Sequence, residues 1–246
     1  MRSFTNILSG ISQKYHWIGF LKAWSIYKNP IREIYCYAIK GQTNQSEVKL
    51  KSALKIKIRE PGDIITIHEI FCRGDYPVTR REKVILDLGA NIGVSALFFL
   101  SECTNAKIIS FEPDPRNFQL YEENISKFKD RAKLVKAAVV PFDEDHVEFT
   151  QFSSSRYGGV GLKGGEKIKV PAKNINTILS ELIDEYGSID ILKIDIESLE
   201  IELLDSIENK YFKHIKKIYI ELPYGTPLTL NGFKSHIQGQ VHQLVK

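Results

Sequence analysis

A glycine-containing turn and an acid that follows it are the residues of this sequence most suited to bind a ligand. Residues 87–93 read Asp-Leu-Gly-Ala-Asn-Ile-Gly and lie at the end of an apolar run. Glycines allow a tight turn, and the N–H groups at the start of a following helix attract negative or electron-rich groups. Glu112 follows one strand–helix–strand crossover later, where a carboxylate can accept hydrogen bonds from both hydroxyls of a ribose. Together the two features predict a nucleoside cofactor.

The residue types in the turn distinguish between two such cofactors. Sites for nicotinamide dinucleotides prefer Gly-x-Gly-x-x-Gly, in which the middle glycine lets the pyrophosphate approach. Here that position is Asn91, and the acidic Asp87 precedes the first glycine. A carboxylate at residue 87 repels a pyrophosphate but suits a ligand that carries an ammonium group and a sulfonium. The sequence therefore favours S-adenosyl-L-methionine.

A second group of acids predicts a reaction centre. In residues 193–197, Lys-Ile-Asp-Ile-Glu, the period of a strand places Lys193, Asp195 and Glu197 on one side. Carboxylates so close together need a partner, which is Lys193, a bound cation or a substrate. An alcohol needs a base to take its proton, and Asp195 is the first candidate, followed by Glu197 and Glu221. The alternative is that Asp195 binds the cofactor or caps a turn.

The elements that must position these residues alternate along the chain. Strands are predicted over residues 84–88, 107–111, 133–140, 189–196 and 217–221. Helices are predicted between them, over residues 93–101, 115–128, 177–186 and 200–207. Such an order implies right-handed parallel crossovers, and so an α/β fold with a doubly wound, mostly parallel, Rossmann-like sheet. A hairpin over residues 147–152 and 167–170 is predicted around the glycine-rich loop 157–165. Residues 153–159 are either a substrate lid or a plain hairpin tip.

The first sixty residues differ from the rest, so we predict an extension over residues 1–60 and the main domain over residues 61–246. A helix is indicated by five aromatic residues at near-helical spacing: Tyr15, Trp17, Phe20, Trp24 and Tyr27. We interpret it as burying its aromatic residues on the main domain or on a partner chain. A membrane-surface helix is the alternative, disfavoured because the polar face carries few lysines. Lysines at 49, 51, 55 and 57 alternate with apolar residues, as on the solvated face or protected edge of a strand pair.

Three motifs carry a family resemblance: residues 84–93, residues 111–117 (Phe-Glu-Pro-Asp-Pro-Arg-Asn) and residues 189–197 (Ile-Asp-Ile-Leu-Lys-Ile-Asp-Ile-Glu). Together they resemble FkbM-type S-adenosylmethionine-dependent methyltransferases. The resemblance implies O-methylation, commonly of hydroxyls on sugars or other secondary metabolites. It also implies which residues contact the cofactor. The methionine end would contact Asp87, Gly89, Asn91 and Gly93. The ribose would contact Glu112 and Pro113, and the adenine would contact Ala137 and Ala138.

The sequence departs from the family pattern at two places. The family usually has glycine after Asp-x-Glu, and this chain has Ser198 there. The family also usually has histidine shortly after the glutamate that ends the fifth strand, whereas here Leu-Pro-Tyr follows Glu221. The residues after Pro223 are also too few for both the helix and the β-hairpin that normally finish a methyltransferase sheet. We therefore expect one helix over residues 232–244 and a shortened C-terminal edge. Because an incomplete edge is a pairing surface, we expect a homo-oligomer.

Composition narrows the remaining possibilities. The net charge is +4 over 246 residues, which permits anionic partners without indicating a nucleic-acid site. The three cysteines are widely spaced, which predicts reduced thiols, a cytoplasmic location and no structural zinc or other metal. No apolar run approaches the roughly 20 residues of a membrane span, so we expect no membrane span. The family resemblance implies a small-molecule or glycan substrate. An RNA or protein methyltransferase, and a degenerate domain that serves as a binding or scaffold protein, remain as alternatives.

Overall fold

The computed structural model describes residues 14–38 and 45–246. The chain divides into two compact units, Met1–Pro77 and Val78–Lys246. The predicted domain boundary after residue 60 stays a prediction, and the compact units divide at a later position. Among the described residues, no helix is both long and apolar enough to cross a membrane.

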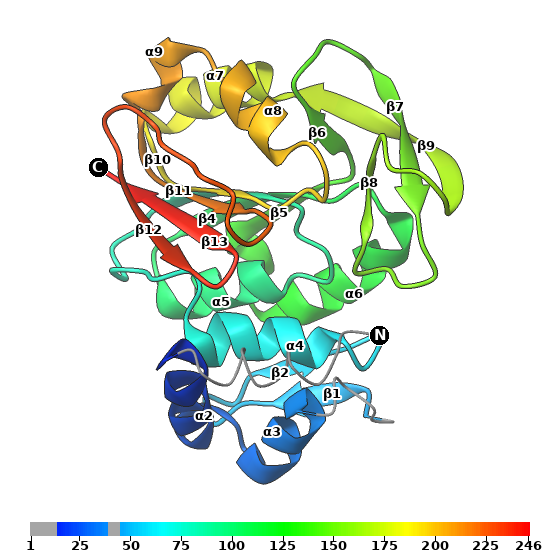
Figure 1. The fold of residues 1–246 in the computed structure, drawn as a ribbon, viewed down its shortest axis with the longest axis vertical. Coiled ribbons are helices and arrows are strands. Elements are labelled where there is room, and N and C mark those ends of the chain that lie inside the picture. The colour runs from blue at the N-terminus through cyan, green and yellow to red at the C-terminus, as the bar shows by residue number, and fades with distance from the viewer. Residues whose placement is uncertain (1–13, 39–44) are drawn as a thin grey trace. The chain divides into compact units, whose positions relative to one another are not determined.

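The first unit packs short helices around a two-stranded hairpin (Figure 1). Its elements are α2 (Lys14–Ile26), α3 (Pro30–Ala38), β1 (Glu47–Lys49), β2 (Lys55–Lys57), α4 (Asp63–Ile67) and the π-helical segment η1 (His68–Arg73). The predicted helix and the lysine-rich strand pair are both present. Tyr27 is fully buried, but Trp17 and Trp24 are 58% and 54% exposed. The expectation that the helix buries its aromatic residues within the chain is therefore wrong for both tryptophans.

The second unit is built on a seven-stranded sheet in the order β12-β13-β11-β10-β3-β4-β5. The strands that precede the C-terminal hairpin are β3 (Val84–Leu88), β4 (Lys107–Phe111), β5 (Ala132–Val135), β10 (Ile189–Ile194) and β11 (Ile215–Glu221). All of these pair in parallel. β3 and β10 are buried at every residue because helices cover both faces of the sheet. The predicted doubly wound α/β sheet is confirmed.

Helices cover the sheet in two layers (Figure 1). One layer holds α5 (Val94–Glu102) and α6 (Pro115–Ile125), and the other holds α7 (Ile175–Tyr186), α8 (Glu200–Ser206) and α9 (Asn209–Phe212). The 3-10 segment η2 (Ser126–Arg131) leads from α6 into β5. α6 begins where its sequence predicts, because the Asp114 side chain accepts from the Arg116 N–H and proline fills the first turn. The apolar faces of α7 and α8 pack on β3, β10 and β11 in one continuous core.

A second sheet, in the order β6-β9-β7-β8, lies beside the main one. It contains β6 (Ala138–Val140), β7 (His146–Gln151), β8 (Gly158–Val160) and β9 (Glu166–Asn174), and the predicted hairpin is its antiparallel pair β7 and β9. The single strand predicted over residues 133–140 is wrong. The chain leaves the main sheet after Val135 and enters the second sheet at Ala138, so an apolar run that reads as one strand serves two sheets.

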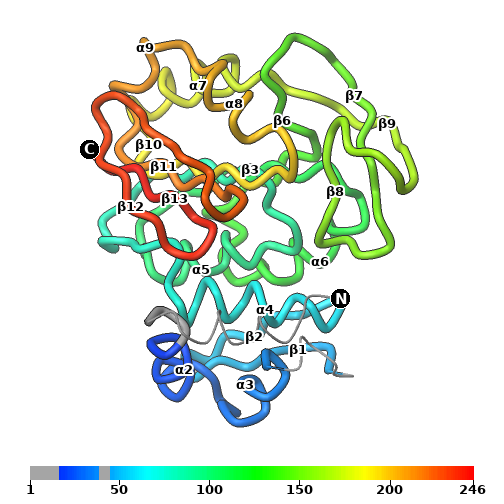
Figure 2. Tube along the Cα trace, in the orientation of Figure 1, coloured from blue at the N-terminus to red at the C-terminus, as the bar shows by residue number. Residues whose placement is uncertain are grey.

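The C-terminus forms a hairpin, β12 (Lys234–Gln238) and β13 (Val241–Val245), traced in red in Figure 2. The helix expected over residues 232–244 is therefore wrong. Gly239, at φ +64°, forms the turn between the strands, and β13 pairs antiparallel with β11. The edge lacks the usual helix, since residues 222–233 are irregular, but it has both strands. The homo-oligomer inferred from an incomplete edge stays a prediction.

Candidate active site

The register of the sheet aligns the predicted site residues in one row. Leu88 pairs with Phe111 on one side and with Ile194 on the other, and Ile194 pairs with Ile220. The next residue on each of these parallel strands is Glu112, Gly89, Asp195 or Glu221. These four residues therefore lie side by side at the carboxyl edge, where open α/β sheets bind their ligands.

Gly89 is required because two backbones meet at this edge. It has φ +78°, and a side chain there would overlap the carbonyl oxygen of Asp195. The N–H of Asp195 donates to the Leu88 carbonyl at 3.2 Å, which extends the β3–β10 pairing to the turn. Gly93, at φ +84° before α5, leaves room for the ring of Tyr121, 2.9 Å from where a Cβ would lie. Both glycines thus serve close packing as well as the turn.

Lys193 ties the two central strands together beneath this edge. Its Nζ lies 3.2 Å from Asp87 Oδ1 and 3.2 Å from Asp195 Oδ2, and it donates to the Gly89 carbonyl at 3.0 Å. Burial disfavours the charge on this side chain, but the carboxylates of Asp195 and Asp87 outweigh it and hold the pKa of Lys193 above its usual value. Lys193 thus pairs with Asp195, one of the two acids that required a partner, and with Asp87. Its burial keeps the cation behind the turn.

Asp87 is fully buried below the turn. Besides its ion pair with Lys193, its carboxylate accepts from Ser95 Oγ at 2.9 Å and from Ser110 Oγ at 3.4 Å. The structure therefore connects Asp87 to β10, to α5 and to β4. These contacts give it a part in fixing the start of α5, which the sequence did not reveal.

Glu112 points its carboxylate back at the turn. Oε2 accepts from the Asn91 N–H at 2.7 Å, while Oε1 accepts from the Asp114 N–H at 2.8 Å and from Asn117 Nδ2 at 3.3 Å. Burial raises the pKa of Glu112 to about 7, although the hydrogen bonds from Asp114 and Asn91 act in the opposite direction. The carboxyl is thus fixed in place and poised to change its charge near neutral pH.

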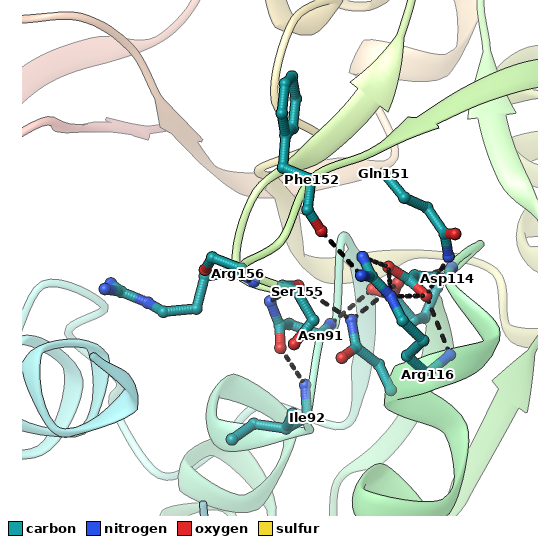
Figure 3. A network of polar contacts seen from close by, with 11 residues as sticks. Asn91, Ile92, Asp114, Arg116, Gln151, Phe152, Ser155 and Arg156 are labelled. Carbon is teal, nitrogen blue, oxygen red and sulfur yellow. Dashed lines mark hydrogen bonds and ion pairs between the residues drawn. The ribbon is translucent and has the colours of Figure 1, made fainter. Parts of the chain in front are cut away.

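The loop between β7 and β8 is attached to the same turn (Figure 3). The backbone of Asn91 adopts φ +49°, and its side chain accepts from the Ile92 N–H at 2.7 Å and donates to the Ser155 carbonyl at 3.3 Å. Asn117 donates to that carbonyl too, at 3.4 Å. In Figure 3 the side chain of Arg156 points away from this cluster. The loop that the sequence left as a lid or a hairpin tip is therefore bonded to the turn and to α6.

A buried acid that sequence reasoning missed anchors the start of this loop. Asp114 accepts from Gln151 Nε2 at 2.7 Å and pairs with Arg116 at 2.5 Å, while Arg116 donates to the Phe152 carbonyl at 2.8 Å (Figure 3). The Asp-Pro pair at residues 114–115 indicated a helix start, but its second role depends on β7, which is distant in sequence. The motif at residues 111–117 therefore supports the loop as well as the predicted ribose site.

The backbone after β10 is strained. Glu197 has φ +57° and Ser198 has φ +146°, a conformation that favours glycine. The carboxylate of Glu200 accepts from the N–H groups of Ile196 and Ser198 at 3.1 Å each, and Ser198 Oγ donates to the Val160 carbonyl at 2.8 Å. The serine that replaces the family's glycine therefore keeps the glycine conformation and bonds the turn to β8.

Gly159 of β8 allows the backbone of β8 to lie close to the turn after β10, because a side chain at residue 159 would overlap the carbonyl oxygen of Glu197. Glu197 lies two residues beyond Asp195, outside the row of four residues, and is exposed. Desolvation and the nearby charges of Asp195 and Glu200 raise its pKa to about 7. Asp195 is 27% exposed at its side chain, so both acids can be reached from solvent.

The remaining predicted residues flank this centre. Ala137 and Ala138, buried at the switch between the two sheets, follow Val135, whose carbonyl accepts from the Glu112 N–H at 3.1 Å. Pro113 is half-buried beside Glu112. The predicted adenine and ribose residues thus lie beside the turn that contains Gly89, Asn91 and Gly93, and Asp87 lies beneath it. In the described part of the chain, no three His, Cys, Asp or Glu side chains group as a metal site would require.

The match to known proteins covers this same region. The model of the methyltransferase FkbM domain matches residues 87–229, from Asp87 to beyond Glu221. The chain belongs to the FkbM methyltransferase family. All four residues of the strand-end row lie inside the matched range, so the row belongs to the domain that defines the family.

This FkbM-family methyltransferase is similar to two curated proteins. Methyltransferase sdnD of Sordaria araneosa is 23% identical over 187 residues, which are 62% of this chain and 72% of the relative. Hexuronic acid methyltransferase AglP of Haloferax volcanii is 24% identical over 184 residues, covering 70% and 72%. A crystal structure of methyltransferase FkbM from Methylobacillus flagellatus aligns at a TM-score of 0.41 and 15% identity, over 78% of this chain and 48% of that chain.

Proposed function

We propose that this methyltransferase uses S-adenosyl-L-methionine to methylate a hydroxyl on a glycan or another secondary metabolite. The strand-end row supports the proposal most directly. In this row Glu112 lies on one side of the turn at Gly89 and Asp195 lies on the other. The Glu112 carboxylate accepts from the Asn91 N–H of the turn, and the Asp195 N–H donates to the Leu88 carbonyl of β3. When bound, the cofactor supplies a methyl group on a positively charged sulfur.

The residues present fit that cofactor. Glu112 retains an acceptor site for a ribose hydroxyl, because each carboxylate oxygen can accept two hydrogen bonds and Oε2 accepts one, from the Asn91 N–H. Asp195 places negative charge at the edge, which suits a cationic ligand, while the compensating Lys193 is only 2% exposed. The backbone at Gly89 and Asn91 offers a surface without bulky side chains toward the methionine end. Pro113, Ala137 and Ala138 complete the proposed contacts with the ribose and adenine.

The proton of the acceptor hydroxyl must pass to a base, and the candidates are Asp195, Glu197 and Glu221. The geometry favours different roles for Asp195 and Glu197. Asp195 is already engaged by Lys193 at 3.2 Å, so it is suited to hold negative charge beside the cofactor. Glu197 is exposed, and with a pKa of about 7 it can exchange a proton at neutral pH. Its strained backbone is a further sign of a functional position.

A glycan acceptor is supported by family membership together with the relative whose name gives hexuronic acid as its substrate. The alternative of a degenerate scaffold protein rests on the shortened C-terminal edge and on Ser198. The first support is weakened, because the C-terminal hairpin adds two strands beside β11. The other, Ser198, adopts the backbone conformation that the family's glycine would favour.

Two measurements on the same variants test the proposal. Binding of S-adenosylhomocysteine is measured by calorimetry, and transfer of labelled methyl from S-adenosyl-L-methionine is measured with a panel of uronic acids, methyl glycosides and phenols. Glu197→Gln should retain binding and lose transfer, and Asp195→Asn should weaken both. Asp205→Asn, an exposed acid on α8, is the matched control and should change neither. Absence of binding by the unmodified protein, or transfer by Glu197→Gln at the parent rate, would contradict the assignment.

A further inference from the structure

The excess positive charge of the protein lies in one unit. Residues 1–77 contain twelve lysines and arginines against six aspartates and glutamates, while residues 78–246 contain 22 basic and 24 acidic residues. The mild net charge of +4 for the chain therefore combines a strongly basic N-terminal unit with a slightly acidic catalytic one. Such a separation points to an anionic partner for the first unit.

Burial makes this contrast sharper at the surface. Three of the six acids, Glu33, Asp63 and Asp75, are buried, and the other three are only partly exposed. By contrast, eight cationic side chains of the described part of this unit are exposed: Lys22, Lys28, Arg32, Lys49, Lys51, Lys55, Lys57 and Arg59. The charge that the described residues of the unit present prominently to solvent is therefore positive.

Large apolar side chains are exposed on the same unit. Trp17, Leu21 and Trp24 follow the i, i+4, i+7 spacing of one helical face of α2, and they are 58%, 74% and 54% exposed. Ile31 and Tyr35, spaced i, i+4 on α3, are 70% and 63% exposed. We call these five residues, three of which are aromatic, the aromatic face. Exposed apolar groups of this number and size on neighbouring helices mark an interaction surface.

The basic hairpin adjoins this face. Lys51 Nζ donates to the Trp24 carbonyl at 2.7 Å, and the Lys51 N–H donates to the Ile26 carbonyl at 2.8 Å. The Lys28 N–H donates to the Lys49 carbonyl at 2.9 Å, so the β1 end of the hairpin is bonded to the C-terminal end of α2. The lysines of the hairpin thus lie next to the helix that carries both tryptophans.

We propose that the aromatic face and its neighbouring lysines dock on the surface of an anionic lipid bilayer. Tryptophan and tyrosine are favoured at the boundary between headgroups and acyl chains, and basic residues beside them are attracted to anionic headgroups. A second copy of this chain fits less well, because two such faces repel each other. A single-stranded nucleic acid is disfavoured because its binding grooves interleave aromatic and basic side chains, whereas here the lysines flank an apolar group.

The protein supplies its own probe, since its two tryptophans are both on the aromatic face. The full chain is titrated with vesicles of equal parts phosphatidylglycerol and phosphatidylcholine, and with vesicles of phosphatidylcholine alone. We expect a blue shift of tryptophan emission and co-sedimentation with the anionic vesicles. Phosphatidylcholine alone should bind at least about ten-fold more weakly, because each lysine near an anionic surface contributes about five-fold. About 1 M salt should remove most of the difference.

Paired variants separate the two contributions. Trp17→Ala with Trp24→Ala should weaken co-sedimentation by about ten-fold or more, and Lys28→Glu with Lys55→Glu should do so on anionic vesicles in particular. All four side chains are exposed, so the fold is expected to survive.

Matched controls come from exposed residues of the second unit. Phe142→Ala with Ile237→Ala, and Lys129→Glu with Lys213→Glu, should leave vesicle binding unchanged. Equal binding to both vesicle types, or an emission that no vesicle shifts, would overturn the proposal. An emission shifted by an RNA oligonucleotide instead of vesicles, or one that changes with protein concentration alone as a larger species forms, would overturn it too.

Discussion

Cofactor affinity should fall as the pH drops below neutral, because the proposed hydrogen bond from a ribose hydroxyl to Glu112 requires the ionised carboxylate. Burial raises the pKa of this carboxyl to about 7 in the protein. Its oxygens already accept from the Asn91 and Asp114 N–H groups at 2.7 and 2.8 Å and from Asn117 Nδ2 at 3.3 Å. These three bonds leave about one of the four acceptor sites of the carboxylate for a ribose hydroxyl, and protonation removes an acceptor site.

The magnitude follows from linkage for one titrating group. With a pKa of about 7, the dissociation constant of S-adenosylhomocysteine should rise about ten-fold between about pH 8 and about pH 6, or about 1.4 kcal/mol. Calorimetry in buffers of different ionisation enthalpy should also show that binding near pH 6 releases about one proton. In the absence of ligand, the folded protein holds a proton between about pH 4.5 and about pH 7 that the unfolded chain has lost. This contribution to stability therefore decreases as the pH rises through that window.

Glu197 provides the matched control, since its pKa is also raised to about 7. Glu197→Gln should keep the pH dependence of binding. Glu112→Gln should weaken binding at every pH and abolish the dependence, because the amide cannot ionise. A constant affinity between about pH 6 and about pH 8, or a slope that persists in Glu112→Gln, would refute this reasoning.

Two backbone predictions concern the strand-end row. Gly89→Ala should lower the free energy of unfolding by about 3 kcal/mol in chemical denaturation, because its Cβ overlaps the Asp195 carbonyl and φ is +78°. Gly187→Ala has the same φ with no atom within 4 Å, so it should lose only about 1 kcal/mol; equal losses would exclude the close approach as the cause. Ser198→Gly relieves strain but loses the hydrogen bond to Val160, so stability should change by less than about 1 kcal/mol. Ser198→Ala, which keeps the strain and loses the bond, should be the less stable variant, and the reverse order would disprove strain at this turn.

Local patterns predicted the elements that position the site. The buried strands at 84–88 and 189–194, the glycine turn and the proline-started helix after Glu112 are each encoded within a few residues. The order of strands follows from parallel crossovers, so Glu112 and Asp195 could be predicted to share one edge. The period of a strand placed Lys193 on the same side as Asp195 and left it as one of three possible partners, and in the structure the two side chains lie 3.2 Å apart.

The errors arose where a local pattern fits two structures. Residues 233, 237, 241 and 244 are apolar at spacings of three and four, which suit a helix, yet Gly239 turns the chain and two strands form. Pairing with β11 decides between these outcomes, and a local pattern does not contain that information. The same limit applies at Ala137, where one apolar run is divided between two sheets, and at Trp17, where helical spacing does not reveal which face is buried.

The roles of the acids were hardest to assign, because their charges depend on partners distant in sequence. Asp87 has the type and position of a residue that faces the ligand, but Lys193, Ser95 and Ser110 surround it below the turn. Glu197 has no local feature that separates it from Asp195, because the main cause of its raised pKa is desolvation in the folded chain, to which the charges of Asp195 and Glu200 add. Under the proposed function, transfer of the hydroxyl proton requires a group that can change charge near neutral pH, and binding a sulfonium requires a carboxylate held in an ion pair. We propose Glu197 for the first role and Asp195, which lies 3.2 Å from Lys193, for the second.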